Sequence, residues 1–124
     1  MTVVLDTNAL MMPVECDIRL FDELDRLLGQ YEPVVPTAVK AELERLADGR
    51  GTEAVAAGVG LELLERCELR ETESTYADDA VVELALAVDA PAVTNDRALR
   101  TRLYDAGVSV ICLRGRNKLE LTQP

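Results

Sequence analysis

The chain has 124 residues, 48% of them hydrophobic, which is enough for one globular domain with a single core and excludes a disordered protein. It contains no histidine, which excludes nucleophilic schemes with a histidine base as well as imidazole metal sites. Its net charge is −10. No apolar run approaches the roughly 18 residues of a membrane span and no signal peptide is apparent, so we expect a cytoplasmic protein without a membrane partner.

The first half of the chain alternates short apolar runs with helical patterns. We predict strands near 2–6 and 33–35, and helices near 17–28 and 37–48. Gly29 is a plausible stop for the first of these helices, and Thr37 a plausible N-cap for the second. The sequence Gly49-Arg50-Gly51 then breaks the chain.

The second half repeats this alternation. We predict helices near 52–66, 76–89 and 96–106, and strands near 67–71, 91–94 and 108–113. Gly58 and Gly60 weaken the first of these helices, so its middle is the least clear. Strands alternating with helices predict one α/β domain over residues 1–124, with a five-stranded, mainly parallel sheet flanked by helices.

In such folds, ligands bind at the carboxyl ends of the strands, where the strand order reverses. Asp6 lies at the carboxyl end of the first predicted strand, and Asp96 lies just past that of the fourth. A switch point between these two strands would place both carboxylates in one crevice.

Four acidic residues, Asp6, Glu42, Asp78 and Asp96, occupy positions that solubility explains poorly, but each also has a structural interpretation. Asp6 and Asp96 are good helix caps. Glu42 lies within the apolar stripe of its helix, either at the solvated edge or paired. Asp78 is at N3 of a capping-box pattern that starts at Thr75.

The helical face distinguishes Asp78 from its neighbour Asp79. Asp78 shares its face with Val81, Val82 and Ala85, whereas Asp79 partly shares its face with Glu83. We therefore prefer Asp78 as the functional carboxylate and keep Asp79 in reserve.

A pocket built from these four carboxylates would contain only oxygen ligands. Clustered carboxylates repel one another, so such a pocket requires a hard divalent cation such as Mg²⁺ or Mn²⁺. Carboxylate clusters that hold these ions are typical of enzymes that cut phosphodiester bonds.

Several ordered motifs together resemble those of PIN-domain ribonucleases over essentially the whole chain. They are Val4-Leu5-Asp6-Thr7-Asn8, Val35-Pro36-Thr37-Ala38-Val39 leading to Glu42, Asp78-Asp79-Ala80-Val81-Val82, and Ala90-Pro91-Ala92-Val93-Thr94-Asn95-Asp96. The segment 113–118 is similar to archaeal PIN proteins related to ribosomal-RNA processing nucleases.

The resemblance implies a three-layer fold and metal-dependent endonucleolytic cleavage of RNA, with Mg²⁺ or Mn²⁺ as cofactor. Asp6, Glu42, Asp78 and Asp96 correspond to the catalytic metal ligands, and Asn8 and Thr94 to supporting hydrogen-bond groups. The alternatives are a VapC-type toxin neutralised by an antitoxin and a non-catalytic RNA or ribosome-assembly binding module. The sequence also leaves open whether the protein forms a homodimer.

Basic residues are concentrated after the last of the four acids. Residues 97–124 have a net charge of +4, whereas residues 1–96 have −14. The overall charge argues against a nucleic-acid partner, but this distribution favours one. We predict that RNA phosphates are bound by Arg97, Arg100, Arg114, Arg116 and Lys118.

Amino-acid usage also suggests an unusual solvent. Eleven arginines against two lysines, many acids and few aromatics are typical of proteins adapted to concentrated salt, as in a halophilic archaeon. A large net charge keeps such proteins soluble.

Overall fold

A six-stranded sheet forms the centre of the computed structural model, which describes residues 1–124. The strand order is β3-β2-β1-β4-β5-β6, and all neighbours are parallel except β5 and β6. The strands are β1 (Thr2–Leu5), β2 (Glu32–Pro36), β3 (Glu68–Arg70), β4 (Ala92–Val93), β5 (Val110–Arg114) and β6 (Lys118–Thr122). The predicted α/β fold with a mainly parallel sheet is confirmed, with six strands instead of five.

Strand β1 lies between β2 and β4, so the strand order reverses there. The chain builds β1, β2 and β3 outward to one side and then returns to build β4, β5 and β6 on the other. The predicted switch point between the first and fourth strands is therefore confirmed, and with it the crevice at their carboxyl ends.

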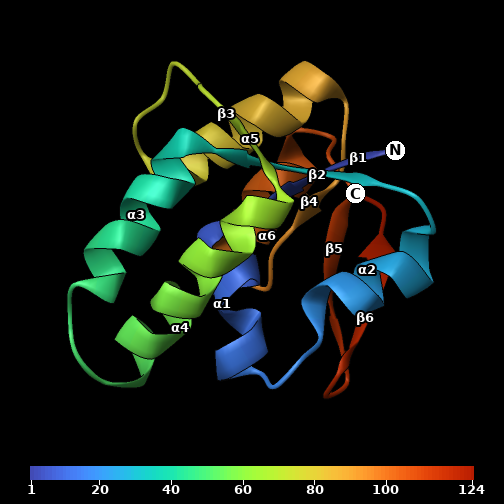
Figure 1. The fold of residues 1–124 in the computed structure, drawn as a ribbon. Helices are drawn as coiled ribbons and strands as arrows, with labels where there is room; N and C mark the ends of the chain where they lie inside the picture. The colour runs from blue at the N-terminus through green and yellow to red at the C-terminus, as the bar shows by residue number, and fades with distance from the viewer.

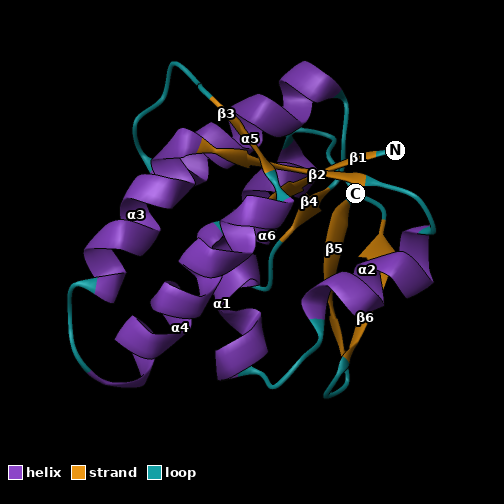
Figure 2. Cartoon of the chain, in the orientation of Figure 1, coloured by secondary structure: helices purple, strands orange, loops and turns teal.

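Helices surround this sheet, and Figure 2 shows the strands as an inner layer among them. The helices are α1 (Thr7–Glu15), α2 (Leu20–Leu28), α3 (Thr37–Ala47), α4 (Gly51–Leu63), α5 (Ala77–Val88) and α6 (Arg97–Asp105), with a short 3₁₀ turn at Leu64–Arg66. Helices α1, α3 and α4 pack against one another, α5 lies on β1 and β2, and α2 lies along β6 (Figure 1). None of the helices combines the length and apolarity needed to span a bilayer.

The core explains why the central strand is a continuous apolar run. Val3, Val4 and Leu5 of β1 have no exposed surface, because a central parallel strand is covered by helices on both faces. They belong to one cluster of 32 buried apolar residues that extends from α1 to β6.

Helix α1 was not predicted from the sequence. Its residues Ala9–Met12 are all buried and form a continuous apolar run without helical periodicity, and the helix contains Pro13. The next helix was predicted from residue 17 but begins at Leu20. Asp17 has a left-handed backbone with φ of 51°, which is incompatible with a helix there.

Strand β6 was also not predicted. The segment after β5 turns at Gly115, where φ is 67°, and Arg114 then pairs with Lys118 in an antiparallel hairpin. Helix α2 covers the outer edge of β6: the Leu119 N–H donates to Glu23 Oε1 at 2.9 Å, and Arg26 donates to the Leu119 carbonyl at 2.8 Å. These contacts fix the basic C-terminal hairpin to the rest of the domain.

Helix α4 continues through Gly58 and Gly60, contrary to the doubt raised by these glycines. A Cβ atom at Gly60 would lie 3.1 Å from the Leu10 carbonyl oxygen of α1 and 3.2 Å from Leu43 Cδ2 of α3. Gly60 therefore permits the close approach of α4 to α1 and α3, which outweighs its low helix propensity.

Candidate active site

The structure brings the four predicted carboxylates together at the carboxyl edge of the sheet. Asp6, Glu42, Asp78 and Asp96 line one pocket of about 220 Å³. They come from the end of β1, the middle of α3, the first turn of α5 and the residue that begins α6. Four segments that are distant in the sequence thus converge on the switch point.

Asp6 and Asp96 are helix caps and pocket residues at the same time. Asp6 Oδ1 accepts a hydrogen bond from the Ala9 N–H at 2.6 Å, and Asp96 Oδ1 accepts one from the Leu99 N–H at 2.9 Å. Each cap uses one carboxylate oxygen. The capping interpretation is therefore correct for both residues and does not exclude a functional one.

Thr94 and Asn8 connect the segments that carry these two acids. The Thr94 hydroxyl, which is fully buried, accepts from the Asp96 N–H at 3.0 Å, and its proximity to the Asp6 carboxyl acts to lower the pKa of Asp6. Asn8 Oδ1 accepts from the Asn95 N–H at 2.8 Å. Both predicted supporting residues thus lie where they can hold α1 against the start of α6.

The pocket disfavours negative charge on its inner acids. Burial raises the pKa of Asp6 to about 7, and the charges of Asp78 and Asp96 act in the same direction, while hydrogen bonds from Thr94 and the Ala9 N–H oppose them. The pKa of Asp78 is also raised, first by burial and then by the charges of Asp96 and Glu42. The acids therefore destabilise one another when no cation balances them.

The raised pKa of Asp6, caused first by its burial, predicts a pH-dependent stability of the metal-free protein. Because the pKa of Asp6 is raised from 3.8 to about 7, the folded state holds a proton that the unfolded state has lost, and the free energy of unfolding falls as pH rises across that interval. Asp6→Asn removes this dependence but keeps the cap. In metal-free buffer at pH 8 the variant should melt no lower than wild type, by differential scanning calorimetry.

Added Mn²⁺ supplies the second half of this test. It should raise the melting temperature of the wild type more than that of Asp6→Asn or Asp96→Asn, because a ligand stabilises the state that binds it. Identical Mn²⁺ shifts in all three proteins would mean that these residues are helix caps only.

Asp79 points away from the pocket toward α6, where its Oδ1 lies 2.7 Å from the Arg102 guanidinium. Asp78 lines the pocket. The capping box proposed for Asp78 is not formed, because Tyr76 caps α5 and makes no side-chain hydrogen bond there. That structural interpretation of Asp78 is wrong. Likewise Pro36, not Thr37, is the N-cap of α3.

Three further polar residues line the pocket and were not predicted: Thr7, Glu15 and Glu53. Thr7 and Glu15 lie on one face of α1, eight residues apart, so their relation is visible only once that helix is known. Thr7 Oγ1 is buried and has no hydrogen-bond partner. Glu53 lies in the first turn of α4. The pocket thus holds six acids.

The donor set fits a hard divalent cation, since every polar side chain in the pocket offers oxygen and the set is strongly anionic. Asp6, Glu42, Asp78 and Asp96 are the residues that could hold such an ion. The structure contains no group of three or more Asp, Glu, Cys or His side chains already placed to hold one.

The predicted RNA-binding cations lie on the β4–β5 side of the pocket. Arg97 follows Asp96 directly and Arg100 lies in the same turn of α6. Arg114 ends β5, and Arg116 and Lys118 follow in the hairpin turn and at the start of β6. None of these five side chains forms an ion pair within the protein.

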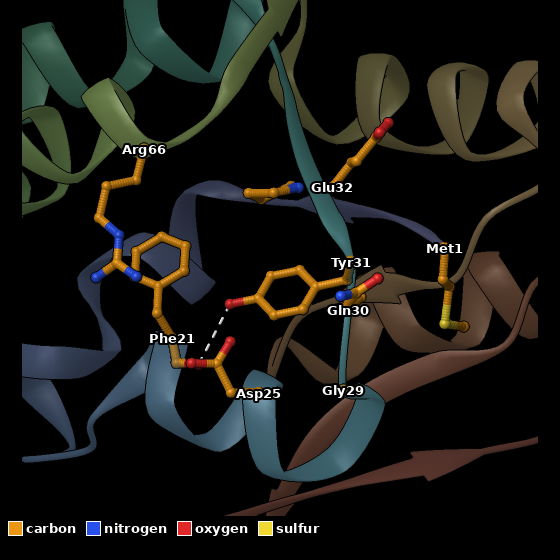
Figure 3. Close-up of a pocket in the computed structure, with 9 residues that line it drawn as sticks. Met1, Phe21, Asp25, Gly29, Gln30, Tyr31, Glu32 and Arg66 are labelled. Carbon is orange, nitrogen blue, oxygen red and sulfur yellow. Dashed lines mark hydrogen bonds between the residues drawn. The ribbon is translucent and has the colours of Figure 1, made fainter.

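A larger hollow of about 610 Å³ lies at the amino ends of β1 and β2 (Figure 3). It shares no lining residue with the pocket of the four carboxylates. Two of its polar groups contact the protein itself: the Tyr31 hydroxyl donates to the Phe21 carbonyl at 3.2 Å, and the Arg66 guanidinium lies 4.1 Å from the centre of the Phe21 ring. The smaller acidic pocket is therefore the candidate active site, in agreement with the usual position of ligands in α/β folds.

The chain is thus an α/β protein with a cluster of carboxylates at its switch point, where the binding site offers mainly oxygen ligands. Within that class, the chain belongs to the PIN-like domain family, whose sequence profile matches residues 3–116. The predicted resemblance to PIN-domain proteins is confirmed.

Two relatives are archaeal ribonucleases. The chain is 30% identical to ribonuclease VapC4 of Methanocaldococcus jannaschii over 124 residues, covering 96% of this chain and 95% of that protein. It is 36% identical to ribonuclease VapC9 of Archaeoglobus fulgidus over 108 residues, covering 86% and 78%. Among solved structures, the PIN-domain endonuclease Utp24 superimposes with a TM-score of 0.80 at 25% identity, covering 99% of this chain and 92% of Utp24.

Proposed function

We propose that the protein is an endoribonuclease that hydrolyses RNA phosphodiester bonds with Mg²⁺ or Mn²⁺. The observation that carries this proposal is the convergence of Asp6, Glu42, Asp78 and Asp96 on one pocket at the switch point. The ribonuclease names of the two archaeal relatives and the endonuclease name of Utp24 support the same activity.

The predicted site residues have distinct roles in this proposal. The four carboxylates would hold the cation, and the caps of Asp6 and Asp96 each occupy one carboxylate oxygen. A divalent cation held there supplies Lewis acidity toward water and toward the phosphodiester. Thr94 and Asn8 keep Asp6 and Asp96 at a fixed separation through their hydrogen bonds.

Hydrolysis forms a bond between a water oxygen and phosphorus and breaks the bond to the 3′ oxygen. In-line attack by water leaves a 5′-phosphate and a 3′-hydroxyl. The chain has no histidine that could take a proton from a ribose 2′-hydroxyl, so water is the expected nucleophile.

The RNA backbone is expected to approach over the β4–β5 side. Arg97 and Arg100 lie beside Asp96, and the hairpin cations lie one strand further along. Glu15 and Glu53 line the same pocket from α1 and α4 and would repel phosphates there. The charge distribution thus gives the pocket one basic side and one acidic side.

The C-terminal hairpin provides a separate prediction. Changing Arg114, Arg116 and Lys118 together to Ala should weaken RNA binding and reduce its log–log salt slope by about one per lost phosphate contact. The rate at saturating RNA should be nearly unchanged, because the carboxylates are intact. Binding by fluorescence anisotropy at several salt concentrations and single-turnover cleavage measure the two quantities.

A matched control removes three exposed cations outside the hairpin, Arg19, Lys40 and Arg70. An equal loss of affinity in this control would show that only net charge matters. Unaltered RNA affinity in the hairpin variant, together with loss of a protein partner, would identify the hairpin as an assembly surface and favour the non-catalytic alternative.

Two biological roles fit the activity. Processing of a ribosomal-RNA precursor is favoured by the similarity of segment 113–118 to archaeal PIN proteins related to ribosomal-RNA processing nucleases. A toxin ribonuclease neutralised by an antitoxin is favoured by the two VapC relatives. Cross-linking and sequencing of co-purified RNA separates the roles, since a processing nuclease should be enriched at precursor sites.

The activity itself is tested with purified protein and a single-stranded RNA. Cleavage should require Mn²⁺ or Mg²⁺ and stop when EDTA is added. Failure of the protein to cut RNA or to bind either ion would overturn the catalytic proposal in favour of a binding module.

A further inference from the structure

The ion pair between Asp79 and Arg102 links the two helices whose starts carry Asp78 and Asp96. Asp79 follows Asp78 in the first turn of α5, and Arg102 lies in the last turn of α6, the helix that Asp96 caps. The remaining four ion pairs each lie within one helix with its cap or within one strand. The 2.7 Å contact of Asp79 with Arg102 is the only ion pair that joins two elements.

We propose that Arg102, acting through Asp79, is a positioning residue that fixes the first turn of α5 against α6 and so sets the separation of the Asp78 and Asp96 carboxylates. This inference rests on the proposed function, in which those two carboxylates share a divalent cation. Neither Arg102 nor Asp79 lines the pocket.

The first turn of α5 has no side-chain cap of its own, so a contact from another helix can help to fix it. Helices α1 and α6 begin with a carboxylate that bonds a backbone N–H of its own first turn, whereas Tyr76 makes no side-chain cap to α5. The loop before α5 is tied down through Glu83, which accepts hydrogen bonds from the Glu73 and Ser74 N–H groups at 2.8 and 3.0 Å. The contact between Asp79 and Arg102 connects this loop and the first turn of α5 to α6.

The two partners are about half exposed, with 46% and 48% of their side-chain surfaces accessible. Surface ion pairs of this kind contribute little to global stability. Loss of the pair should therefore move the first turn of α5, with Asp78, while leaving the melting temperature nearly unchanged.

Loss of the Arg102 charge and loss of its positioning role predict opposite changes in Mn²⁺ affinity. Arg102 is close enough to Asp78 that its charge acts to lower the pKa of that carboxyl. A positive charge near the pocket repels a divalent cation, so removing it through Arg102→Ala should tighten Mn²⁺ binding if charge alone matters. Loss of positioning should weaken Mn²⁺ binding instead.

The test is calorimetric titration of Mn²⁺ into wild type and variants. We expect Arg102→Ala to weaken Mn²⁺ affinity roughly tenfold, as for other groups that orient metal ligands. Arg102→Lys should restore most of it. In the Arg102→Ala background, Asp79→Asn should have little further effect, because both changes break one contact. Arg19→Ala, which removes a cation that is paired with Asp22 and does not line the pocket, is the control.

Unchanged or tighter Mn²⁺ binding by Arg102→Ala would overturn this inference and leave the proposed function intact. Absence of Mn²⁺ binding by the wild type would overturn the proposed function and the inference with it. Melting curves in metal-free buffer confirm that each variant is folded.

Discussion

Replacing Asp6 or Asp96 by Asn should each lower the rate of RNA cleavage by at least roughly two orders of magnitude, the scale expected for loss of a catalytic metal ligand. Asn caps a helix about as well as Asp, so the hydrogen bonds to the Ala9 and Leu99 N–H groups can persist. The variants lose a negative charge in the pocket and little else. Single-turnover cleavage at saturating Mn²⁺ measures the effect.

The matched control is Asp89→Asn. Asp89 is exposed, lies outside the pocket and has a left-handed backbone that Asn tolerates. Its variant should cleave RNA at the wild-type rate. Wild-type activity in Asp96→Asn would remove that residue from the site and leave only its capping role.

The second large effect distinguishes two adjacent acids of α5. Asp78→Asn should abolish RNA cleavage, because Asp78 lines the pocket with Asp6 and Asp96. Asp79→Asn should reduce cleavage less, because Asp79 contacts Arg102 instead of the pocket. Initial rates of both variants over a range of Mn²⁺ concentrations measure the ranking.

High Mn²⁺ adds a further distinction, since a displaced carboxylate can still bind the ion and a missing one cannot. Excess Mn²⁺ should therefore restore activity to Asp79→Asn but not to Asp78→Asn. The opposite ranking would mean that the first turn of α5 is rotated by about 100°, one residue of a helix.

Elements whose burial differs between faces could be predicted from the sequence. Helix α2 shows this: Phe21 and Leu24 are buried, Asp22 and Asp25 are exposed, and Gly29 ends the helix as predicted. Helix α1 is buried along most of its length, so it lacks the periodicity on which such predictions depend. Strand β6 alternates polar and apolar residues, but only two of its residues are apolar and one of them, Leu121, is exposed. Their packing is decided by contacts between distant segments.

The four carboxylates could be proposed from the sequence because each disturbs a local pattern. Asp6 ends a buried strand and Glu42 lies in an apolar stripe, and the switch point between β1 and β4 follows from the alternation of strands and helices. Thr7 and Glu15 could not be found in this way, because they share the undetected helix α1. The contact between Asp79 and Arg102 depends on how α5 and α6 pack.

End-group analysis of the cleaved RNA tests the central claim most directly. A substrate labelled at its 5′ end is cut by wild-type protein with Mn²⁺, with and without EDTA, and a second substrate carries a 2′-deoxy sugar at the cleaved position. Hydrolysis by water predicts 5′-phosphate and 3′-hydroxyl ends, no products with EDTA, and continued cleavage of the 2′-deoxy substrate. Products with 2′,3′-cyclic phosphate ends, or cleavage that persists in EDTA, would contradict a metal-dependent carboxylate site.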